Sequence, residues 1–105
     1  MNLKINYERI LKDCFWDYNF TAKELDKLAL SNNEQEQSFL FQKILLNSTS
    51  LFNDLKIFKL DVLTDLITNY KVPMFNNKYI FKRKNMAEVY FLDKPVLVNE
   101  LKWIV

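Results

Sequence analysis

Apolar residues recur through the first 70 positions at the three- and four-residue spacing of amphipathic helices. This spacing predicts helices over residues 21–30, 33–47 and 50–70. A shorter helix is predicted over residues 6–13, where a strand is the alternative. Such stripes are typical of helices that face the core of a small bundle. The widest apolar stripe lies in the second of these helices and consists of Leu40, Phe41, Ile44 and Leu45.

Polar residues mark where these helices begin and end. Thr21 and Glu24 have the spacing of a capping box, in which each side chain satisfies a backbone N–H at the start of the helix. Residues 31–33 repeat this pattern before the next helix. Asn47 is the expected left-handed residue at the end of that helix, since the chain has no glycine. Residues 48–50 then supply a further N-cap.

The stretch over residues 50–70 is expected to hold two helices rather than one. Its apolar positions keep nearly the same period throughout, so periodicity alone does not separate the two cases. Asp61 can cap a second helix, which favours a break near residues 59–61. Pro73 then ends the helical region, because the residue before a proline avoids the α conformation.

The chain changes character after Pro73. Residues 78–84 and 88–92 are rich in aromatic and β-branched side chains, and residues 96–98 follow a turn-like Asp-Lys-Pro. We interpret these segments as two or three short strands, with a helix over residues 85–92 as the alternative.

These elements predict one domain over residues 1–105, helical over 1–72 and basic and β-prone over 73–105. The expected fold class is mainly α: a small bundle of about four helices with a short C-terminal β-hairpin. That order also fits a winged helix, in which the third or fourth helix enters the major groove and the hairpin is the wing. A last turn is expected at the end of the chain, formed by Asn99, Leu101 and Trp103.

The composition removes several classes of site. The chain has no histidine and no glycine, which excludes histidine-based triads and zinc sites as well as glycine-rich phosphate loops. The single cysteine, Cys14, excludes an internal disulfide, and we expect it to be structural rather than nucleophilic. The spaced carboxylates are expected on solvated faces. The sequence therefore predicts a protein that is not an enzyme and uses no metal and no cofactor. The carboxylate pairs concerned are Asp13 with Asp17 and Asp61 with Asp65.

The apolar runs of the chain are all short. None is long enough to cross a bilayer, and the first residues are polar rather than the apolar core of a signal peptide. The sequence therefore predicts a cytoplasmic protein that makes no membrane contact.

Positive charge is concentrated towards the C-terminal end. Residues 1–70 carry 8 basic and 10 acidic side chains, whereas residues 71–105 carry 7 and 3. Basic side chains alternate there with aromatic ones, an arrangement that can contact phosphates while stacking on bases. A nucleic acid or an acidic protein is thus a candidate partner, although we favour the interpretation that these lysines keep an edge strand solvated. The candidate nucleic-acid-binding residues are Lys78, Tyr79, Lys82, Arg83 and Lys84.

Residues 15–20 (Phe-Trp-Asp-Tyr-Asn-Phe) form the most aromatic stretch of the chain. Its Asp and Asn suit a turn. We favour the interpretation that the aromatic side chains, Trp16 included, anchor the core, because large aromatic residues contribute most to packing. The alternative is that they bind a protein partner. The candidate partner-binding residues are Phe15, Trp16, Asp17 and Tyr18.

The same stretch carries a family resemblance. Residues 15–18, then residues 39–47 and a helix ending in Tyr70, are similar to small bacterial and archaeal proteins that begin with an FWD-type motif and continue into an I-x-R/K-I/V-L run. Such proteins are often encoded beside a nucleotidyltransferase-type toxin of the abortive-infection kind. The resemblance covers residues 14–70, and the family usually has Arg where this chain has Lys43.

The resemblance implies a non-enzymatic binding protein. It would be the antitoxin-like half of a toxin–antitoxin or phage-defence pair and would neutralise its cognate toxin, a protein, by direct contact. A homodimer is a further assembly that the sequence leaves open. The alternative function is a nucleic-acid-binding regulator of the winged-helix type, with Lys82, Arg83 and Lys84 on its wing.

Overall fold

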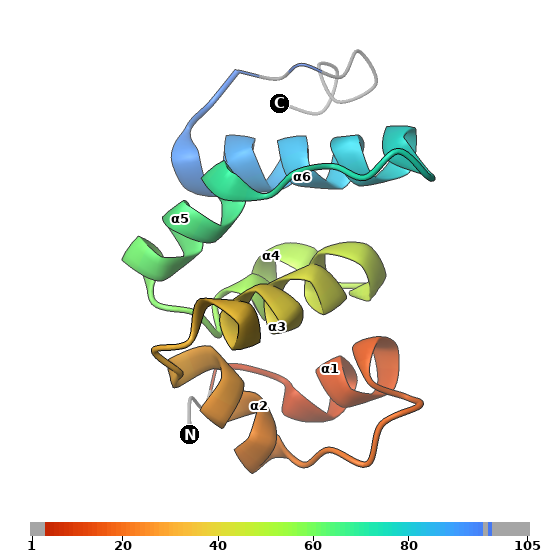
Figure 1. Ribbon diagram of the computed structural model, residues 1–105, viewed down its shortest axis with the longest axis vertical. Helices are drawn as coiled ribbons and strands as arrows, with labels where there is room; N and C mark the ends of the chain where they lie inside the picture. The colour runs from red at the N-terminus through yellow and green to blue at the C-terminus, as the bar shows by residue number, and fades with distance from the viewer. Residues whose placement is uncertain (1–3, 96, 98–105) are drawn as a thin grey trace.

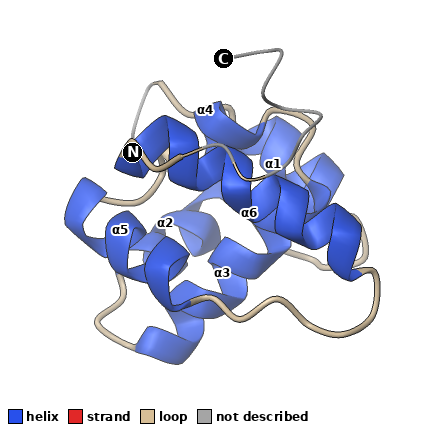
Figure 2. Ribbon diagram, turned by 90° about the horizontal axis from the view of Figure 1, so that it is seen from above, coloured by secondary structure: helices blue, strands red, loops and turns tan. Residues whose placement is uncertain are grey.

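The computed structural model describes residues 4–95 and 97, which form six helices and no strand. Figure 1 shows the helices in three tiers along the longest axis of the molecule, and Figure 2 shows the same helices from above. The first tier holds the first two helices, the second tier the next two, and the third tier the last two. The helices are α1 (Tyr7–Cys14), α2 (Ala22–Leu30), α3 (Glu34–Asn47), α4 (Leu51–Leu55), α5 (Leu60–Asn69) and α6 (Asn77–Leu92).

Helix α3 is the centre of the bundle, because it packs against each of the other five helices. The apolar stripe predicted for it is confirmed, since all four of its members are buried. The other helices also add fully buried side chains to the same core cluster. Those residues include Ile10 from α1, Leu25 from α2, Leu55 from α4 and Ile67 from α5.

Local hydrogen bonds explain where two of these helices begin. The predicted capping box is present at the start of α2, where the backbone N–H of Thr21 donates to the Glu24 carboxylate at 2.7 Å. The side chain of Asn33 caps α3 by accepting from the backbone N–H groups of Gln35 at 2.8 Å and Glu36 at 3.3 Å. The predicted starts of both helices are therefore confirmed.

The stretch over residues 50–70 does hold two helices, as predicted, but α5 begins earlier than expected. Its N-cap is Lys59, so Asp61 lies inside the first turn rather than at the cap. Asp61 bonds only the adjacent backbone N–H, that of Val62, at 2.9 Å. The N-cap of α4 is Ser50, whose own side chain makes no capping bond. The prediction that Asn47 is left-handed is wrong, since it is the last residue of α3.

The predicted β-hairpin is wrong, and so is the winged-helix arrangement, which needs that hairpin as its wing. The residues from Asn77 to Leu92 form the single helix α6. Strand propensity reflects how side chains fit a half-buried surface, and the surroundings override it here. Helix α6 buries Ile80 and Ala87 against the rest of the bundle, and polar side chains on the same helix reach the ends of α3 and α5. The helix that we held as the alternative over residues 85–92 is thus correct, and it extends further towards the N-terminus.

Asparagine and aspartate take the conformations that glycine usually supplies. Among the described residues, positive φ occurs at Asn76 (52°) and Asp93 (55°), which flank α6. These residue types tolerate the left-handed region better than others, because their short polar side chains bond locally. The two residues let the chain turn into and out of α6 without a glycine.

A buried asparagine holds the chain that follows α6. Asn85 is fully buried, and its side-chain oxygen accepts from the backbone N–H of Leu97 at 2.8 Å. Its amide nitrogen donates to the backbone carbonyl of Pro95 at 3.3 Å. Of the strand predicted over residues 96–98, only Leu97 is described, and it is not in a strand. The last turn predicted at Asn99, Leu101 and Trp103 lies outside the described residues.

Candidate binding surface

The aromatic stretch after α1 is divided between core and surface. Phe15 is 1% exposed and belongs to the core, so it cannot contact a partner as we had considered. Trp16 is 78% exposed, so the favoured prediction that it anchors the core is wrong. Asp17 is exposed, and Tyr18 is 38% exposed. The structure therefore leaves three of the four candidate partner-binding residues accessible.

An aromatic cluster, made of Phe15, Tyr18, Phe20 and Phe39, holds this turn in place. The ring centroids of Phe15 and Tyr18 are 5.4 Å apart, in an edge-to-face arrangement that suits aromatic quadrupoles. Phe15 also lies 5.2 Å from Phe20 and 5.8 Å from Phe39. The backbone N–H of Tyr18 closes the turn by donating to the carbonyl of Phe15 at 2.9 Å. Trp16 is thus presented from a turn whose neighbouring residues are packed.

Helix α3 reaches the same turn through Lys43. The Lys43 ammonium lies 4.9 Å from the ring centroid of Tyr18 and 5.9 Å from that of Phe39, within the range of cation–π attraction. A surface hollow of about 250 Å³ lies here, lined by residues that include Tyr18, Lys43, Leu46 and Asn47. Sequence reasoning missed Lys43 as a surface residue. The signal that could have indicated this was the family resemblance, because Lys43 occupies a position where the family usually has another basic residue, Arg.

Helix α6 meets the C-terminal end of α3 from the other side. The Tyr79 hydroxyl donates to the carbonyl of Leu46 at 3.2 Å. Arg83 donates to the carbonyl of Leu45 and, at 2.6 Å, to that of Ser48, and its guanidinium lies 5.6 Å from the ring centroid of Tyr79. Tyr18 and Tyr79, one residue of each predicted site, therefore both lie near the end of α3, Tyr18 beside Lys43 and Tyr79 at the Leu46 carbonyl. We use the name aromatic–basic surface for Tyr18, Lys43 and Tyr79 together with the exposed Trp16, which lies in the same turn as Tyr18.

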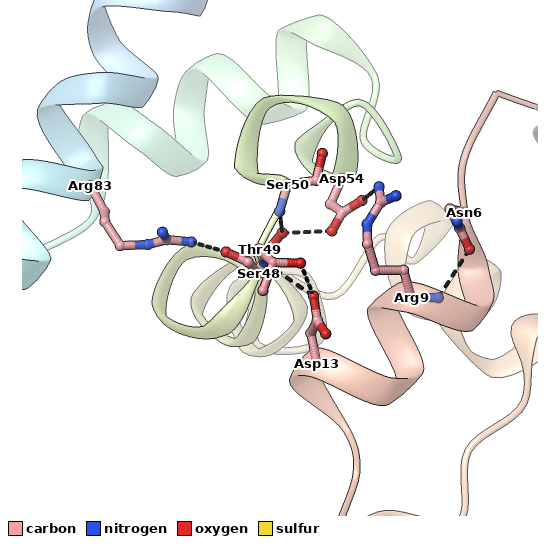
Figure 3. Close-up of polar contacts among 8 residues, drawn as sticks. All are labelled: Asn6, Arg9, Asp13, Ser48, Thr49, Ser50, Asp54 and Arg83. Atoms are coloured by element: carbon pink, nitrogen blue, oxygen red, sulfur yellow. Dashed lines mark hydrogen bonds and ion pairs between the residues drawn. The ribbon is translucent and has the colours of Figure 1, made fainter.

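The turn between α3 and α4 is fixed by a network of polar contacts (Figure 3). The Ser48 hydroxyl donates to the buried Asp54 carboxylate at 2.6 Å and accepts from the backbone N–H of Ser50 at 2.9 Å. Arg9 of α1 forms an ion pair with Asp54. Both the backbone N–H and the hydroxyl of Thr49 donate to Asp13, at 3.1 and 2.6 Å. Figure 3 shows Arg83 reaching the same turn from the opposite side.

These contacts connect the two halves of the aromatic–basic surface. Asp13 lies three residues before Trp16, and Arg83 lies one helical turn after Tyr79. Both residues bond the same turn, residues 48–50, although they come from opposite tiers of the bundle. The network therefore sets the distance between the end of α1 and the start of α6.

The electrostatics of the network follow from the same bonds. The hydrogen bond to Asp54 raises the pKa of Arg9 above its ordinary value, against the opposing effect of desolvation. The hydrogen bonds from Thr49 lower the pKa of Asp13, so its ionised form is the one that the fold favours. Both charges are therefore structural parts of the network.

Cys14 has no means of acting as a nucleophile at neutral pH. Its side chain is buried, and burial, helped by the nearby Asp54 and Asp13 charges, raises the pKa of the thiol to about 12. The thiol is therefore protonated under physiological conditions. The structural role predicted for Cys14 agrees with this environment.

The predicted nucleic-acid site is not assembled as a wing. Besides Arg83, Lys84 is used inside the fold, since its ammonium donates to the carbonyl of Tyr70 at 2.8 Å. Lys78 and Tyr79 are exposed in the first turn of α6, and Lys82 is partly buried. The five candidate residues therefore do not form one continuous row of side chains directed at a phosphate backbone.

A second hollow, of about 400 Å³, lies between α3 and α5 and is lined mainly by polar side chains such as Glu34, Gln37 and Asp65. Tyr70 also lines it. Its hydroxyl is buried with no hydrogen-bond partner among the described residues, and burial raises its pKa. Over the described ranges, 4–95 and 97, no group of three or more His, Cys, Asp or Glu side chains converges to hold a metal ion.

None of the helices within the described part of the chain is both long enough and apolar enough to span a bilayer. Comparison of the chain with family models, curated proteins and solved structures gives no match.

Proposed function

We propose that this protein is a non-enzymatic binding protein that acts on a protein partner, in the manner of the antitoxin-like half of a toxin–antitoxin or phage-defence pair. The observation that carries the proposal is Trp16, which is 78% exposed on a turn that Phe15 and Tyr18 fix by their ring contact. Folding gains little from a tryptophan in that position, because its apolar area stays in water. A partner that covers the indole would remove that apolar area from water, which favours binding.

The surroundings of Trp16 support a protein as the partner. Tryptophan, tyrosine and arginine dominate the residues that carry binding energy in protein interfaces. Tyr18 follows Trp16 in the same turn, and Lys43 lies over the Tyr18 ring. Because Phe15 and Phe39 already hold the Tyr18 ring in place, that side chain loses little conformational entropy on binding.

The antitoxin assignment is supported by the residues that carry the family resemblance. Those residues include Trp16 and Tyr18 in the FWD-type motif, and Lys43 in the helical run. Lys43 lies over the Tyr18 ring, and Trp16 precedes Tyr18 by two residues in the same turn. The part of the chain that resembles the family is thus the part that presents the candidate binding residues.

The proposal is tested with the product of the gene adjacent to the one that encodes this chain. The two purified proteins are titrated by calorimetry, and the two genes are co-expressed to measure relief of growth arrest. We expect a stable complex, and we expect Trp16→Ala to weaken it at least tenfold while the circular dichroism of the chain is unchanged. The same change should restore growth arrest in the co-expression assay.

Leu30→Ala is the matched control, because Leu30 is also a large exposed apolar residue and lies at the far end of α2. It should leave the affinity unchanged. Failure of the adjacent product to bind, or equal affinity for the Trp16→Ala and unmodified chains, would overturn the proposal.

A further inference from the structure

The connection between α5 and α6 carries the most exposed large apolar side chain among the described residues. Met74 is 89% exposed and the adjacent Phe75 is 68% exposed, while Phe81 on the following helix is exposed as well. Val72, Pro73, Met74 and Phe81 line a surface hollow of about 370 Å³ whose walls are mainly apolar. We call these residues, together with Phe75, the α5–α6 surface.

This surface is held in shape by bonds at both of its ends. Lys84 fixes the end of α5 by donating to the Tyr70 carbonyl at 2.8 Å. At the other end, Asn76 takes the left-handed conformation, and its carbonyl accepts from the backbone N–H of Ile80 at 3.2 Å to begin α6. The apolar side chains between them are therefore presented from an anchored connection.

The chain around the surface is basic, although Lys71 also lines the neighbouring hollow that contains Glu34 and Asp65. Residues 66–87 contain five basic side chains and no acidic one. Lys71 and Lys78 are exposed at the two ends of the connection, and Lys78 also lines the hollow. Helix α6 begins here as well, and it has neither an acidic residue in its first turn nor a side-chain cap, so the positive end of its dipole adds to the lysine charges.

We propose that the α5–α6 surface is a docking site for an acidic segment of a partner protein that inserts one bulky apolar side chain into the hollow. The hollow accepts the apolar side chain, and Lys71 and Lys78 pair with carboxylates that flank it. Methionine suits such a site, because its flexible thioether adapts to the side chain that it meets. This proposal rests on the proposed function and adds to it the chemistry of one segment of the partner protein.

The geometry favours a protein segment over a lipid surface. A hollow with apolar walls matches a single inserted side chain, whereas a bilayer is best contacted by a convex apolar tip surrounded by basic residues. The position of the surface also favours a protein. In Figure 1 the start of α6 and the α1–α2 turn both lie at the right-hand edge of the molecule, in the third and the first tier, so a partner that spans the tiers can reach both.

The test uses a displayed library of random 16-residue peptides, selected against the full chain. We expect the enriched peptides to share one Leu, Phe, Met or Trp flanked by Asp or Glu. The affinity of a selected peptide is then measured by fluorescence anisotropy. Met74→Ser, which changes a wall of the hollow, and Phe75→Ser beside it should each weaken peptide binding at least tenfold, as should Lys78→Glu. A Lys71→Glu and Lys78→Glu double variant should select basic peptides instead.

Leu60→Ser is the matched control, because Leu60 is an exposed apolar residue at the start of α5, outside the α5–α6 surface. It should leave peptide affinity unchanged. Peptides without acidic residues, or peptides whose binding survives Phe75→Ser, would overturn the proposal. So would the absence of any enriched peptide together with sedimentation on phosphatidylserine vesicles that Phe75→Ser abolishes, because that result assigns the surface to membranes.

The outcome is separable from the test at Trp16. If the adjacent gene product binds through Trp16 and Phe75→Ser has no effect on any peptide, the proposed function stands and this inference fails. If acidic peptides bind through Phe75 while the adjacent product does not bind, the inference stands without the antitoxin assignment.

Discussion

The two longest helices, α3 and α6, are held in the bundle by different chemistry. Helix α3 has 14 residues and contributes four adjacent, buried apolar side chains to the core. Helix α6 has 16 residues but buries only Ile80, Asn85 and Ala87. Its Met86, Phe91 and Leu92 pack against the core while only partly buried. Hydrogen-bond donors add to this attachment, because Tyr79, Arg83 and Lys84 bond carbonyls at the ends of α3 and α5.

The bonds from α6 compensate for a feature that is missing at the C-terminal ends of α3 and α5. Neither α3 nor α5 has a basic residue in its last turn, although cations there stabilise the negative end of the helix dipole. Helix α6 supplies those cations from elsewhere in the chain: Arg83 to α3 and Lys84 to α5. The basic cluster that suggested a polyanion partner is thus, in part, a set of C-terminal caps.

Breaking the core of α3 should have the largest effect. Phe41 is buried, and its ring lies 5.7 Å from that of Tyr70 and 6.4 Å from that of Phe58, centroid to centroid. We expect Phe41→Ala to lower the free energy of unfolding by about 3–5 kcal/mol, measured by urea denaturation. Gln42→Ala, at the next and exposed position, is the control. A loss below about 1 kcal/mol would show that α3 is not the centre of the core.

Breaking the polar attachment of α6 should cost less. Arg83→Met removes the charged donor from two carbonyls and should lower the free energy of unfolding by about 1.5–3 kcal/mol. Lys78→Met changes an exposed lysine on the same helix and should leave the stability nearly unchanged. Equal effects of the two substitutions in urea denaturation would show that the carbonyl bonds do not hold α6.

The pH dependence of stability should give the smallest effect, at Asp13. The Thr49 hydrogen bonds lower its pKa in the folded chain below the ordinary value of 3.8. The stabilisation is therefore present above that value and is lost as the pH falls through the lower folded pKa. Thr49→Val should remove this part of the acid dependence in thermal melts between pH 6 and pH 3. Unchanged acid dependence in the variant would contradict the role of these bonds.

The same contrast explains which elements could be predicted from the sequence. The stripe in α3 is visible because apolar burial repeats at a fixed spacing, and the starts of α2 and α3 are visible because their caps are local. Helix α6 could not be predicted in the same way. The carbonyls that its Arg83 bonds lie more than 30 residues away in the sequence, and a local pattern does not reveal such distant partners. Its aromatic and β-branched composition then favoured strands, and tertiary contacts overrode that preference.

The candidate surface was predictable only in part. The stretch over residues 15–20 stood out by composition, but composition does not say which of Phe15 and Trp16 is buried. That is decided by the turn, which directs Phe15 to Phe20 and Phe39 and leaves Trp16 outside. Met74 and Phe75 gave no signal, because two apolar residues beside a proline are as common in cores as on surfaces.

The side chain of Asn85 bonds the chain that follows α6 in the way that a neighbouring β-strand would, through one donor and one acceptor. Its partners there are the carbonyl of residue 95 and the N–H of residue 97, so these bonds do not depend on the side chains at those positions. Position 97 should therefore accept nearly any residue during evolution, with proline as the exception, since proline has no N–H to donate. Position 85 has no such freedom, since aspartate would offer only the acceptor and leucine neither group.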